Sequence, residues 1–299
     1  AGNLNWLGFN ASSAFTTNFT GTNDNVFLAA VGGAVLNDLA NTASVSATLS
    51  SSDSGKTLTI ISDRNATSAG TTDFSQVNVS ATVTFAGSIT LASTGNDADG
   101  PDRVLVDAIV TSTEGSITIV SALDALAGSS GGLSASTSGQ SISITADADS
   151  ASGGSVTLNN STNNVSITGG AGIITLQGGA VTQNSGTVNA GSGTVVIDSN
   201  DNAVSLAGTI ESSNAATAIT IRDASTVTLS GDLKATNSGG AIAIGASGGD
   251  AITGAITQTG GKVTAGDLLT IVGSSNTVSL TQNTNNVGRI TSSSTGALT

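Results

Sequence analysis

The chain has 299 residues, with 39 Gly, one Pro and no Cys, His, Met or Tyr. Seven Lys and Arg residues stand against 20 Asp and Glu, which gives a formal net charge of −13. The absence of Cys and His excludes disulfides, thiolate or imidazole metal sites and Ser/His/Asp or Cys/His catalytic sets, and the acidic balance argues against nucleic acid as a partner.

Residues 1–50 are the aromatic part of the chain. Five of the seven Trp and Phe residues lie there, namely Trp6, Phe9, Phe15, Phe19 and Phe27. The periodicity found in the rest of the chain is not visible in this segment. Because the end of a stacked β-structure exposes unpaired strand edges, we predict that residues 1–50 form a cap or dock on another subunit through these aromatic residues.

From about Thr57 onward, short segments alternate apolar and polar residues. A period of two is typical of half-buried strands, and the Gly, Asn, Ser and Asp residues between the segments favour tight turns. No stripe with helical spacing competes with this pattern. The apolar pairs include Leu58/Ile60, Val77/Val79, Val104/Val106, Ile117/Ile119, Ile142/Ile144, Val165/Ile167, Val195/Ile197, Val227/Leu229 and Leu269/Ile271.

Residues 204–221 align with residues 227–244, so that Val204 falls on Val227. The offset between the two copies defines a repeating unit. Three short strands and three turns fill such a unit, and neither a sandwich nor an antiparallel barrel predicts a repeat after every third strand. The sequence therefore predicts an all-β fold over residues 51–299. We expect a right-handed parallel β-helix, or solenoid, with about 23 residues per rung.

A longer repeat leads to the C-terminal end. Residues 180–206 match residues 255–280, with Gln183 on Gln258, and the apolar alternation continues from Val278 to Leu298. A solenoid that stops in this pattern exposes a strand edge. We therefore expect the solenoid to be open at this end, where it pairs with a neighbouring molecule or continues in a longer chain.

Five short stretches follow one another between residue 256 and the end of the chain: ITQ (256–258), AGDL (265–268), VSL (278–280), NNV (285–287) and TGAL (295–298). This succession resembles the repeats of filamentous-haemagglutinin-like proteins of bacteria, which belong to two-partner secretion systems. The resemblance implies a secreted or surface-displayed β-helical fibre that acts in adhesion, in a cell envelope or in a biofilm matrix.

One acidic segment, residues 96–102 with the sequence NDADGPD, is the best candidate for a small site. Its alternating oxygen side chains and its Gly suit a hard cation, so that Asp97, Asp99 and Asp102 would bind Ca²⁺. The alternative is an exposed acidic turn without an ion. We expect that the chain requires no other cofactor.

Seven Asn residues lie in glycosylation sequons, which permit modification in an organism that has the pathway. They are Asn10, Asn18, Asn65, Asn78, Asn159, Asn160 and Asn164.

Catalysis is not expected. Polysaccharide-degrading β-helices need clustered carboxylates, or Lys and Arg with calcium, and aromatic platforms for sugar rings. Here the basic residues are scattered, Glu114 and Glu211 are far apart in sequence, and no aromatic residue follows Phe85.

The sequence thus predicts an extracellular or cell-surface structural protein: a stiff fibre or adhesin segment whose partners are further copies of itself or the continuation of a longer chain, and beyond these a host surface or polysaccharide. One alternative is an S-layer or matrix lattice, or a module that binds ice or polysaccharide through ranks of Thr. Against it, Thr59, Ser143 and Thr157 do not share one phase in the sequence. A β-helical enzyme is less favoured.

No apolar run reaches the roughly 18 residues that a transmembrane helix needs, so no such helix is expected.

Overall fold

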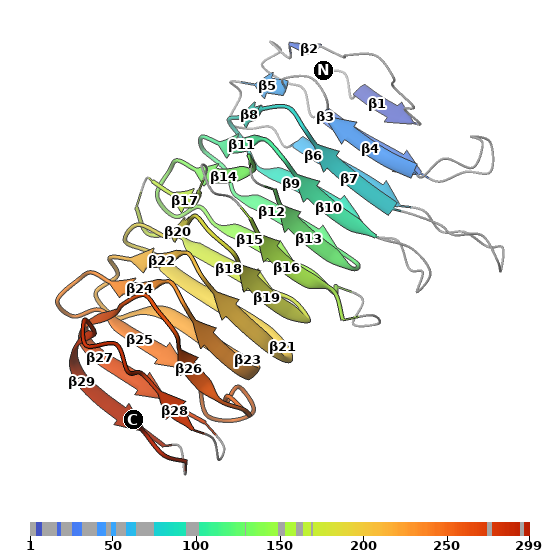
Figure 1. Cartoon of the computed structure of the whole chain (residues 1–299). Coiled ribbons are helices and arrows are strands. Elements are labelled where there is room, and N and C mark those ends of the chain that lie inside the picture. The colour runs from blue at the N-terminus through green and yellow to red at the C-terminus, as the bar shows by residue number, and fades with distance from the viewer. Residues whose placement is uncertain are drawn as a thin grey trace, which may run out of the picture.

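Parallel strands stack along one axis to form an elongated solenoid (Figure 1). The computed structural model describes residues 4–7, 17–18, 26–31, 41–45, 49–51, 58–63, 75–93, 102–128, 130–148, 153–159, 164–168, 170–273, 277–293 and 296–299. Within these ranges every element is a strand, and turns of the solenoid lie about 24 residues apart. The predicted all-β parallel solenoid is therefore confirmed, while its right-handed sense stays a prediction.

Each turn adds one strand to each of three faces. Face 1 contains β1(Leu4–Leu7), β3(Val26–Val31), β6(Leu58–Asp63), β9(Ile89–Ser93), β12(Ile117–Ser121), β15(Ile142–Thr145), β18(Ile173–Gln177), the first parts of β21(Thr194–Leu206) and β23(Thr217–Leu229), β25(Ala241–Ile244) and the last parts of β27(Val263–Ile271) and β29(Asn286–Ser292).

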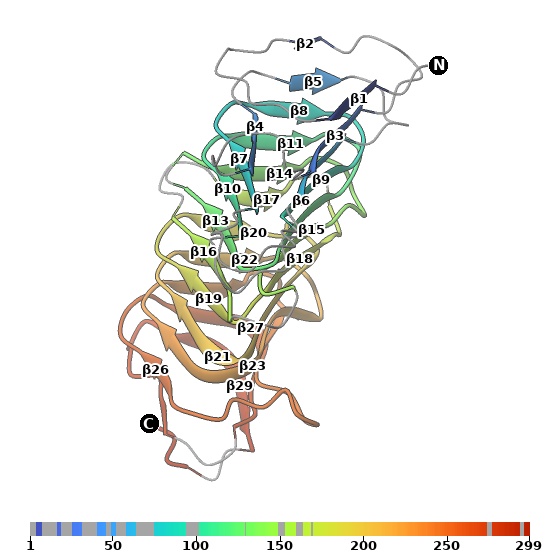
Figure 2. The same cartoon turned by 90° about the vertical axis from the view of Figure 1, so that its right-hand side faces the viewer.

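Face 2 contains β4(Asn41–Val45), β7(Ser75–Val79), β10(Arg103–Val106), β13(Asp124–Ala127), β16(Ser155–Leu158), β19(Ala180–Gln183), the last parts of β21 and β23, β26(Ile256–Gln258) and β28(Val278–Ser279). Face 3 contains β2(Thr17–Asn18), β5(Leu49–Ser51), β8(Val83–Phe85), β11(Ile109–Ser112), β14(Gly132–Ala135), β17(Val165–Ile167), β20(Thr187–Asn189), β22(Thr209–Ser212), β24(Asp232–Ala235) and the first parts of β27 and β29. Figure 2 shows face 3 as a ladder of short strands from β5 to β17.

The strand pairing reproduces the sequence repeat. Val204 on β21 is the partner of Val227 on β23, as the alignment of the two copies predicts. The spacing is not constant, because the step from Ile142 to its partner Ile174 is longer than the step from Ile174 to its partner Val195. Strands must stay in register for hydrogen bonding, but the loops that connect them can lengthen on the surface. Insertions therefore collect in these loops.

Val, Ile, Leu and Ala fill the interior in columns that run along the axis. On face 1 one such column is fully buried from Leu58 to Leu269 and contains Leu58, Ile89, Ile117, Ile142, Ile174, Val195, Ile219, Ile242 and Leu269. Strands that alternate inward and outward residues bury one apolar side chain at every second position. Branched aliphatic residues suit this narrow interior because they pack well on a pleated surface.

Two buried serines hold the corner between faces 3 and 1. Ser112 Oγ donates to Gly87 O at 2.9 Å, and it accepts a hydrogen bond from Gly115 N at 2.8 Å. Ser212 repeats this arrangement, with Gly193 O as acceptor at 2.6 Å and Asn214 N as donor at 3.0 Å. Each hydroxyl therefore satisfies backbone groups that the corner would otherwise leave buried without partners.

Hydroxyl residues form ranks on the outside. On face 1 the register aligns Thr59, Thr90, Thr118, Ser143 and Thr175, which are half-buried between neighbouring turns. On face 2 a second rank joins Thr157, Thr182, Ser205, Thr228, Thr257 and Ser279. The expectation that Thr59, Ser143 and Thr157 do not share one phase was wrong for Thr59 and Ser143, because insertions between strands hide a register that the pairing restores. Thr157 lies on face 2, in the other rank.

The two ends of the solenoid belong to the same stack. At the N-terminal end β1 pairs in parallel with β3, and at the C-terminal end β29 pairs in parallel with β27. Trp6 and Phe27 occupy positions on β1 and β3, while Phe9, Phe15 and Phe19 lie outside the described residues. The cap or docking role of residues 1–50 stays a prediction. The part of the chain that the structure describes contains no helix able to cross a bilayer.

Candidate functional site: an acidic corner between three turns

Among the described residues, a group of charged side chains lies where faces 1 and 2 meet. Strands β21 and β23 run through this corner without a break, each changing direction at residues with positive φ. These are Asn200 at 44°, Asp201 at 61° and Asp223 at 50°. Asn and Asp enter the left-handed region more readily than other residues with a Cβ, so the sequence DSNDN at 198–202 suits a sharp bend.

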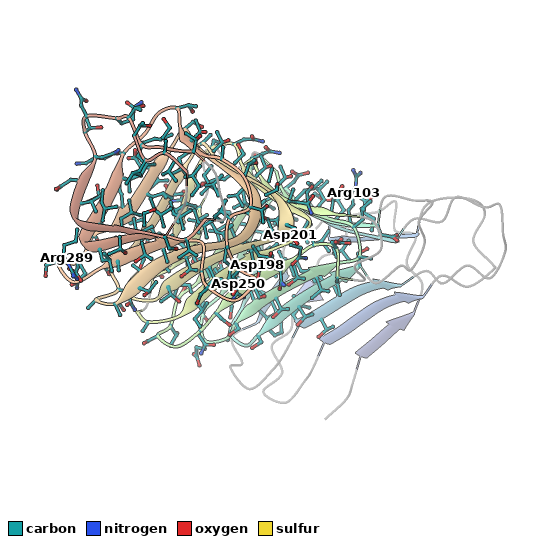
Figure 3. All side chains as sticks on the ribbon, turned by 90° about the horizontal axis from the view of Figure 1, so that it is seen from below. Arg103, Asp198, Asp201, Asp250 and Arg289 are labelled. Carbon is teal, nitrogen blue, oxygen red and sulfur yellow. The ribbon has the colours of Figure 1, made fainter. Side chains whose placement is uncertain are left out.

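Arg222 connects acidic residues from the turns on either side of it. Its Nε donates to Asp198 Oδ2 at 3.0 Å, and its Nη1 lies 3.8 Å from Asp250 Oδ2. The Asp198 side chain is only 9% exposed, whereas those of Arg222 and Asp250 are about 40% exposed. In Figure 3, Asp198, Asp201 and Asp250 lie next to one another near the middle of the view. The ion pair with Arg222 compensates the burial of Asp198.

Backbone and hydroxyl groups tie the same three turns together. Ser199 Oγ lies 2.8 Å from Asn202 O and 3.1 Å from Asp223 O, so it can donate to either. Asp223 N donates to Asp250 O at 3.1 Å, and Ala246 N donates to the same oxygen at 2.9 Å. The corner is thus held by polar contacts between turns rather than by apolar packing alone.

The carboxylates outnumber the single guanidinium. Burial raises the pKa of Asp223 above its ordinary value, and the negative charges of Asp201, Asp198 and Asp250, with a hydrogen bond to Asp201, raise it further. Both causes disfavour the charged form. Even so, no group of three or more acidic side chains among the described residues is arranged to hold a metal ion. We therefore interpret the corner as a structural tie whose stability depends on pH.

The predicted calcium segment is described only at its last residue. Asp102 is 3% exposed, and its carbonyl oxygen accepts hydrogen bonds from Leu123 N, Asp124 N and Ser121 Oγ at 3.0–3.2 Å. Asp97 and Asp99 lie outside the described residues. The calcium site stays a prediction.

The sequons fall in different surroundings. Asn78 lies in the middle of β7 and is half-buried, with an Oδ1 that is out of contact with solvent and has no hydrogen-bond partner. Asn159 and Asn164 are exposed in turns, and their Oδ1 atoms accept from Asn184 Nδ2 and Thr187 N respectively. Asn18 lies in β2, while Asn10, Asn65 and Asn160 lie outside the described residues. Glycosylation of these residues stays a prediction.

Glu114 and Glu211 do not form a pair. Glu114 follows β11, and Glu211 lies on β22, four turns farther along face 3. Four turns correspond to about 19 Å, whereas the two carboxylates of a glycosidase stand about 5 to 10 Å apart. These two residues therefore cannot act as a catalytic pair. The prediction that the chain is not an enzyme stays a prediction.

Among the described residues, a cavity lies in the interior of the solenoid. It is small and apolar, and it is lined by Val106, Ile119, Ala125, Leu126, Ala127, Leu133, Ile144 and Leu158. Val106, Ala127 and Leu158 follow one another in one column. The cavity arises because the side chain of Ala127 is smaller than those of both neighbours.

Sequence reasoning missed the acidic corner and two buried amides, Gln183 and Gln258. The Gln residues gave a signal, because they coincide in the longer repeat that matches residues 180–206 with residues 255–280. The acidic corner gave a weaker signal in the sequence. Asp198, Arg222 and Asp250 lie in successive turns of the solenoid that differ in length, so their spacing is not constant. Comparisons with protein-family models, curated proteins and solved structures gave no match.

Proposed function

We propose that this chain is a structural protein, a stiff β-solenoid segment that serves as a spacer or fibre at the cell surface or outside the cell. The observation that supports this proposal best is the parallel pairing of successive strands, which continues on all three faces between β7 and β29. Main-chain hydrogen bonds along the axis and a continuous apolar interior resist bending. A stable rod with a simple, repetitive surface suits a mechanical role.

We further propose that the chain is a segment of a filamentous-haemagglutinin-like surface protein. It rests on residues 256–299, whose matching stretches fall on β26, β27, β28, the start of β29 and the last turn. An adhesin segment of this type would act outside the cell. Binding of antibodies raised against the chain to intact cells of the source organism would support that location, and binding only after the cells are made permeable would contradict it.

Electron microscopy and limited proteolysis of the whole chain test the rod. We expect straight particles of uniform width that resist cleavage. Val181→Asp places a charge in the buried column of face 2 and should create a cleavage point there, because an unpaired buried charge is costly. Thr182→Asp, at the adjacent outward position, should leave the rod intact. Round or collapsed particles of the wild type would contradict the proposal.

A second candidate function is a surface-binding or lattice module. The observation that favours it is the hydroxyl rank of face 1, in which Thr90, Thr118 and Ser143 follow one another at the spacing of the turns. Regularly spaced hydroxyls suit a regular polar surface such as crystalline polysaccharide. Cosedimentation with cellulose or chitin tests this function. Thr118→Lys on face 1 should abolish binding if face 1 is the binding surface, and Thr182→Lys on face 2 should not.

A further inference from the structure

The aliphatic interior does not by itself determine which turn stacks on which. β28 pairs with β26, whose sequence is ITQ, but the preceding strand on face 2 ends in the similar sequence VTL (227–229). On face 1, β29 pairs with β27, and the preceding β25 has two inward isoleucines where β27 has Leu269 and Ile271. A slip that leaves one turn out of the stack as a loop would therefore still pack aliphatic residues on aliphatic residues. Repeat proteins are prone to such misassembly.

One pair of side chains distinguishes these turns. Gln258 ends β26 on face 2 and is 3% exposed, while the half-buried Asn285 lies in the next turn, beside Val263 in the inward column of face 3. Gln258 Nε2 donates to Asn285 Oδ1 at 2.9 Å, and Asn285 Nδ2 donates to Gln258 Oε1 at 2.7 Å. Val263 N donates to the same Oδ1 at 2.9 Å. The two amides thus satisfy each other across the corner between faces 2 and 3.

The turns before this one carry apolar residues at both positions. The inward column of face 2 holds Leu229 one turn before Gln258, and the inward column of face 3 holds Leu233 one turn before Val263. If β28 and β29 stacked on β23 and β24, Asn285 would meet Leu229 instead of Gln258 and would lose both reciprocal hydrogen bonds. Because a buried amide that loses its partner is costly, the slipped stack carries a penalty that the native stack does not.

Gln183 shows that a buried Gln alone does not distinguish one turn from another. It lies in the same column of face 2, but Ile210 takes the position of Asn285 in the turn after it. Its Nε2 donates to the backbone oxygens of Gly186 and Thr209, both at 3.2 Å. Every turn has a backbone oxygen at the position of Thr209, so Gln183 would find an acceptor in a slipped stack as well. Selection requires the second amide.

We propose that Gln258 and Asn285 are a register pair, which makes the turn of β28 and β29 stack on the turn of β26 and β27 rather than on an earlier one. Buried polar residues can fix registry in this way at some cost in stability. The register pair acts during folding, when turns with similar strands compete for the same partner. This role goes beyond that of a spacer or fibre, because it concerns how a repetitive chain selects its own partners.

Pulse-labelling hydrogen exchange during refolding of the whole chain tests the register pair. A molecule that stacks β29 on β24 and β25 protects the amides of β29 while those of β27 stay in an open loop. Greater protection of β29 than of β27 therefore reports the slip, and the wild type should not show it. In Asn285→Leu, and in the double variant Gln258→Leu, Asn285→Leu, the ratio of slipped to native stacks should rise about tenfold, as expected for one buried amide without its partner.

Gln183→Leu is the matched control, because it removes an equally buried amide whose hydrogen bonds go to backbone oxygens. It should give the wild-type order of protection in β27 and β29. The wild-type order in both Asn285 variants, or an equal slip in the control, would overturn the proposal. Either result would leave the rod itself standing, since electron microscopy of the folded chain tests the rod separately.

A second register pair can be built elsewhere in the solenoid. Ile210→Asn places an amide beside Gln183, whose Oε1 is buried without a partner, whereas Leu233→Asn places the same amide one turn farther along, beside Leu206. Ile210 and Leu233 are both fully buried. Urea unfolding should show a smaller loss of stability for Ile210→Asn than for Leu233→Asn, and Gln183→Leu should remove this difference. Equal losses in the presence of Gln183 would overturn the proposal.

Discussion

Gln183 and Gln258 lie three turns apart in one inward column of face 2, with Leu206 and Leu229 between them. Both are almost fully buried. Gln258 exchanges two hydrogen bonds with the amide of Asn285, at 2.9 and 2.7 Å. Gln183 donates from Nε2 to Gly186 O and Thr209 O, both at 3.2 Å, but its Oε1 is buried without a partner. Although the two positions are equivalent in the repeat, burial of the amide costs more free energy at Gln183 than at Gln258.

Replacing each amide by Leu should therefore give different results. Gln183→Leu removes a buried oxygen without a partner and places an apolar side chain beside Leu158 and Leu206, so we expect a change in unfolding free energy within about 1 kcal/mol. Gln258→Leu removes both hydrogen bonds to the amide of Asn285, which then keeps only the donor Val263 N, at 2.9 Å, and the acceptor Leu280 O, at 3.4 Å. We expect this loss to cost about 1–3 kcal/mol. Urea unfolding followed by circular dichroism compares the two variants. Equal losses would contradict this account of the amides.

Gly139 and Gly245 provide a second matched pair, because both have φ of +83°. A Cβ at Gly139 would meet no atom within 4 Å, whereas at Gly245 it would lie 1.9 Å from Val272 O. Gly139→Ala should cost only the conformational penalty of about 1–2 kcal/mol. Gly245→Ala should cost at least about 3 kcal/mol, since the backbone of the next turn must move. Thermal unfolding distinguishes them, and similar midpoints would contradict the close approach between turns.

The fold could be predicted from the sequence because strand positions repeat in character. Val204 and Val227 are partners in the structure as they are in the alignment. The longer repeat spans three turns, since the register leads from Gln183 through Leu206 and Leu229 to Gln258. Inward positions require branched aliphatic residues in nearly every turn, and this requirement leaves a periodic trace in the sequence.

The outward ranks and the acidic corner could not be predicted in the same way. The loops between Ile142 and Ile174 contain additional residues, so the step between these two partners is longer than the usual repeat. An alignment with a fixed period therefore fails to match residues that are neighbours in the structure. Arg222 meets Asp198 and Asp250 because of how the corner bends, and bends set by positive φ at Asp223 have no period. Chemistry in the turns depends on local conformation, which the strand pattern does not encode.

Stability should depend on pH through Asp223. The raised pKa means that the folded chain holds this proton more tightly than the unfolded chain, whose pKa is near the ordinary 3.8. Asp223 therefore lowers stability as pH rises above about 4 and through its folded pKa. Asp223→Asn, which keeps the preference for positive φ, should raise stability at pH 7 by less than about 1 kcal/mol, as for a partly exposed charge. The gain should vanish near pH 3.

Asp232 is the control, because its pKa is shifted in the opposite direction to that of Asp223. The hydrogen bond from Lys234, at 2.7 Å, is the main reason that the pKa of Asp232 is lowered. Its contribution is present above the ordinary pKa and is lost as pH falls through the folded pKa. Asp232→Asn should therefore destabilise the chain at pH 7, and its unfolding midpoint should approach that of the wild type in acid. Two variants with parallel pH profiles would contradict both assignments.

Calcium removal tests the segment that contains Asp97, Asp99 and Asp102. If these residues bind Ca²⁺, chelation should lower the unfolding temperature, and calcium at 100 times its dissociation constant should restore about 2.7 kcal/mol. Mg²⁺ should restore less, because it demands a stricter octahedral site. The double variant Asp97→Asn, Asp99→Asn should lose the response to calcium. An unfolding temperature that is unchanged by chelation would rule out the site.

The cavity beside Ala127 should accept a larger residue. Ala127 lies between Val106 and Leu158 in one column and is 4% exposed. Ala127→Val adds two methyl groups next to the cavity and places a β-branched residue in a strand, so we expect a gain of about 0.5–2 kcal/mol. Urea unfolding should show a higher midpoint with an unchanged slope.

Ala135 shows why the position matters more than the residue type. It is fully buried on face 3 between Ser112 and Ile167, and it does not line the cavity. Ala135→Val should therefore overfill a packed column and cost about 1–3 kcal/mol. Because neighbouring turns contact only one another, both effects should be confined to the turns around β13 and β14. Hydrogen exchange of individual strands measures this, and a stabilising Ala135→Val would contradict the packing described for the interior.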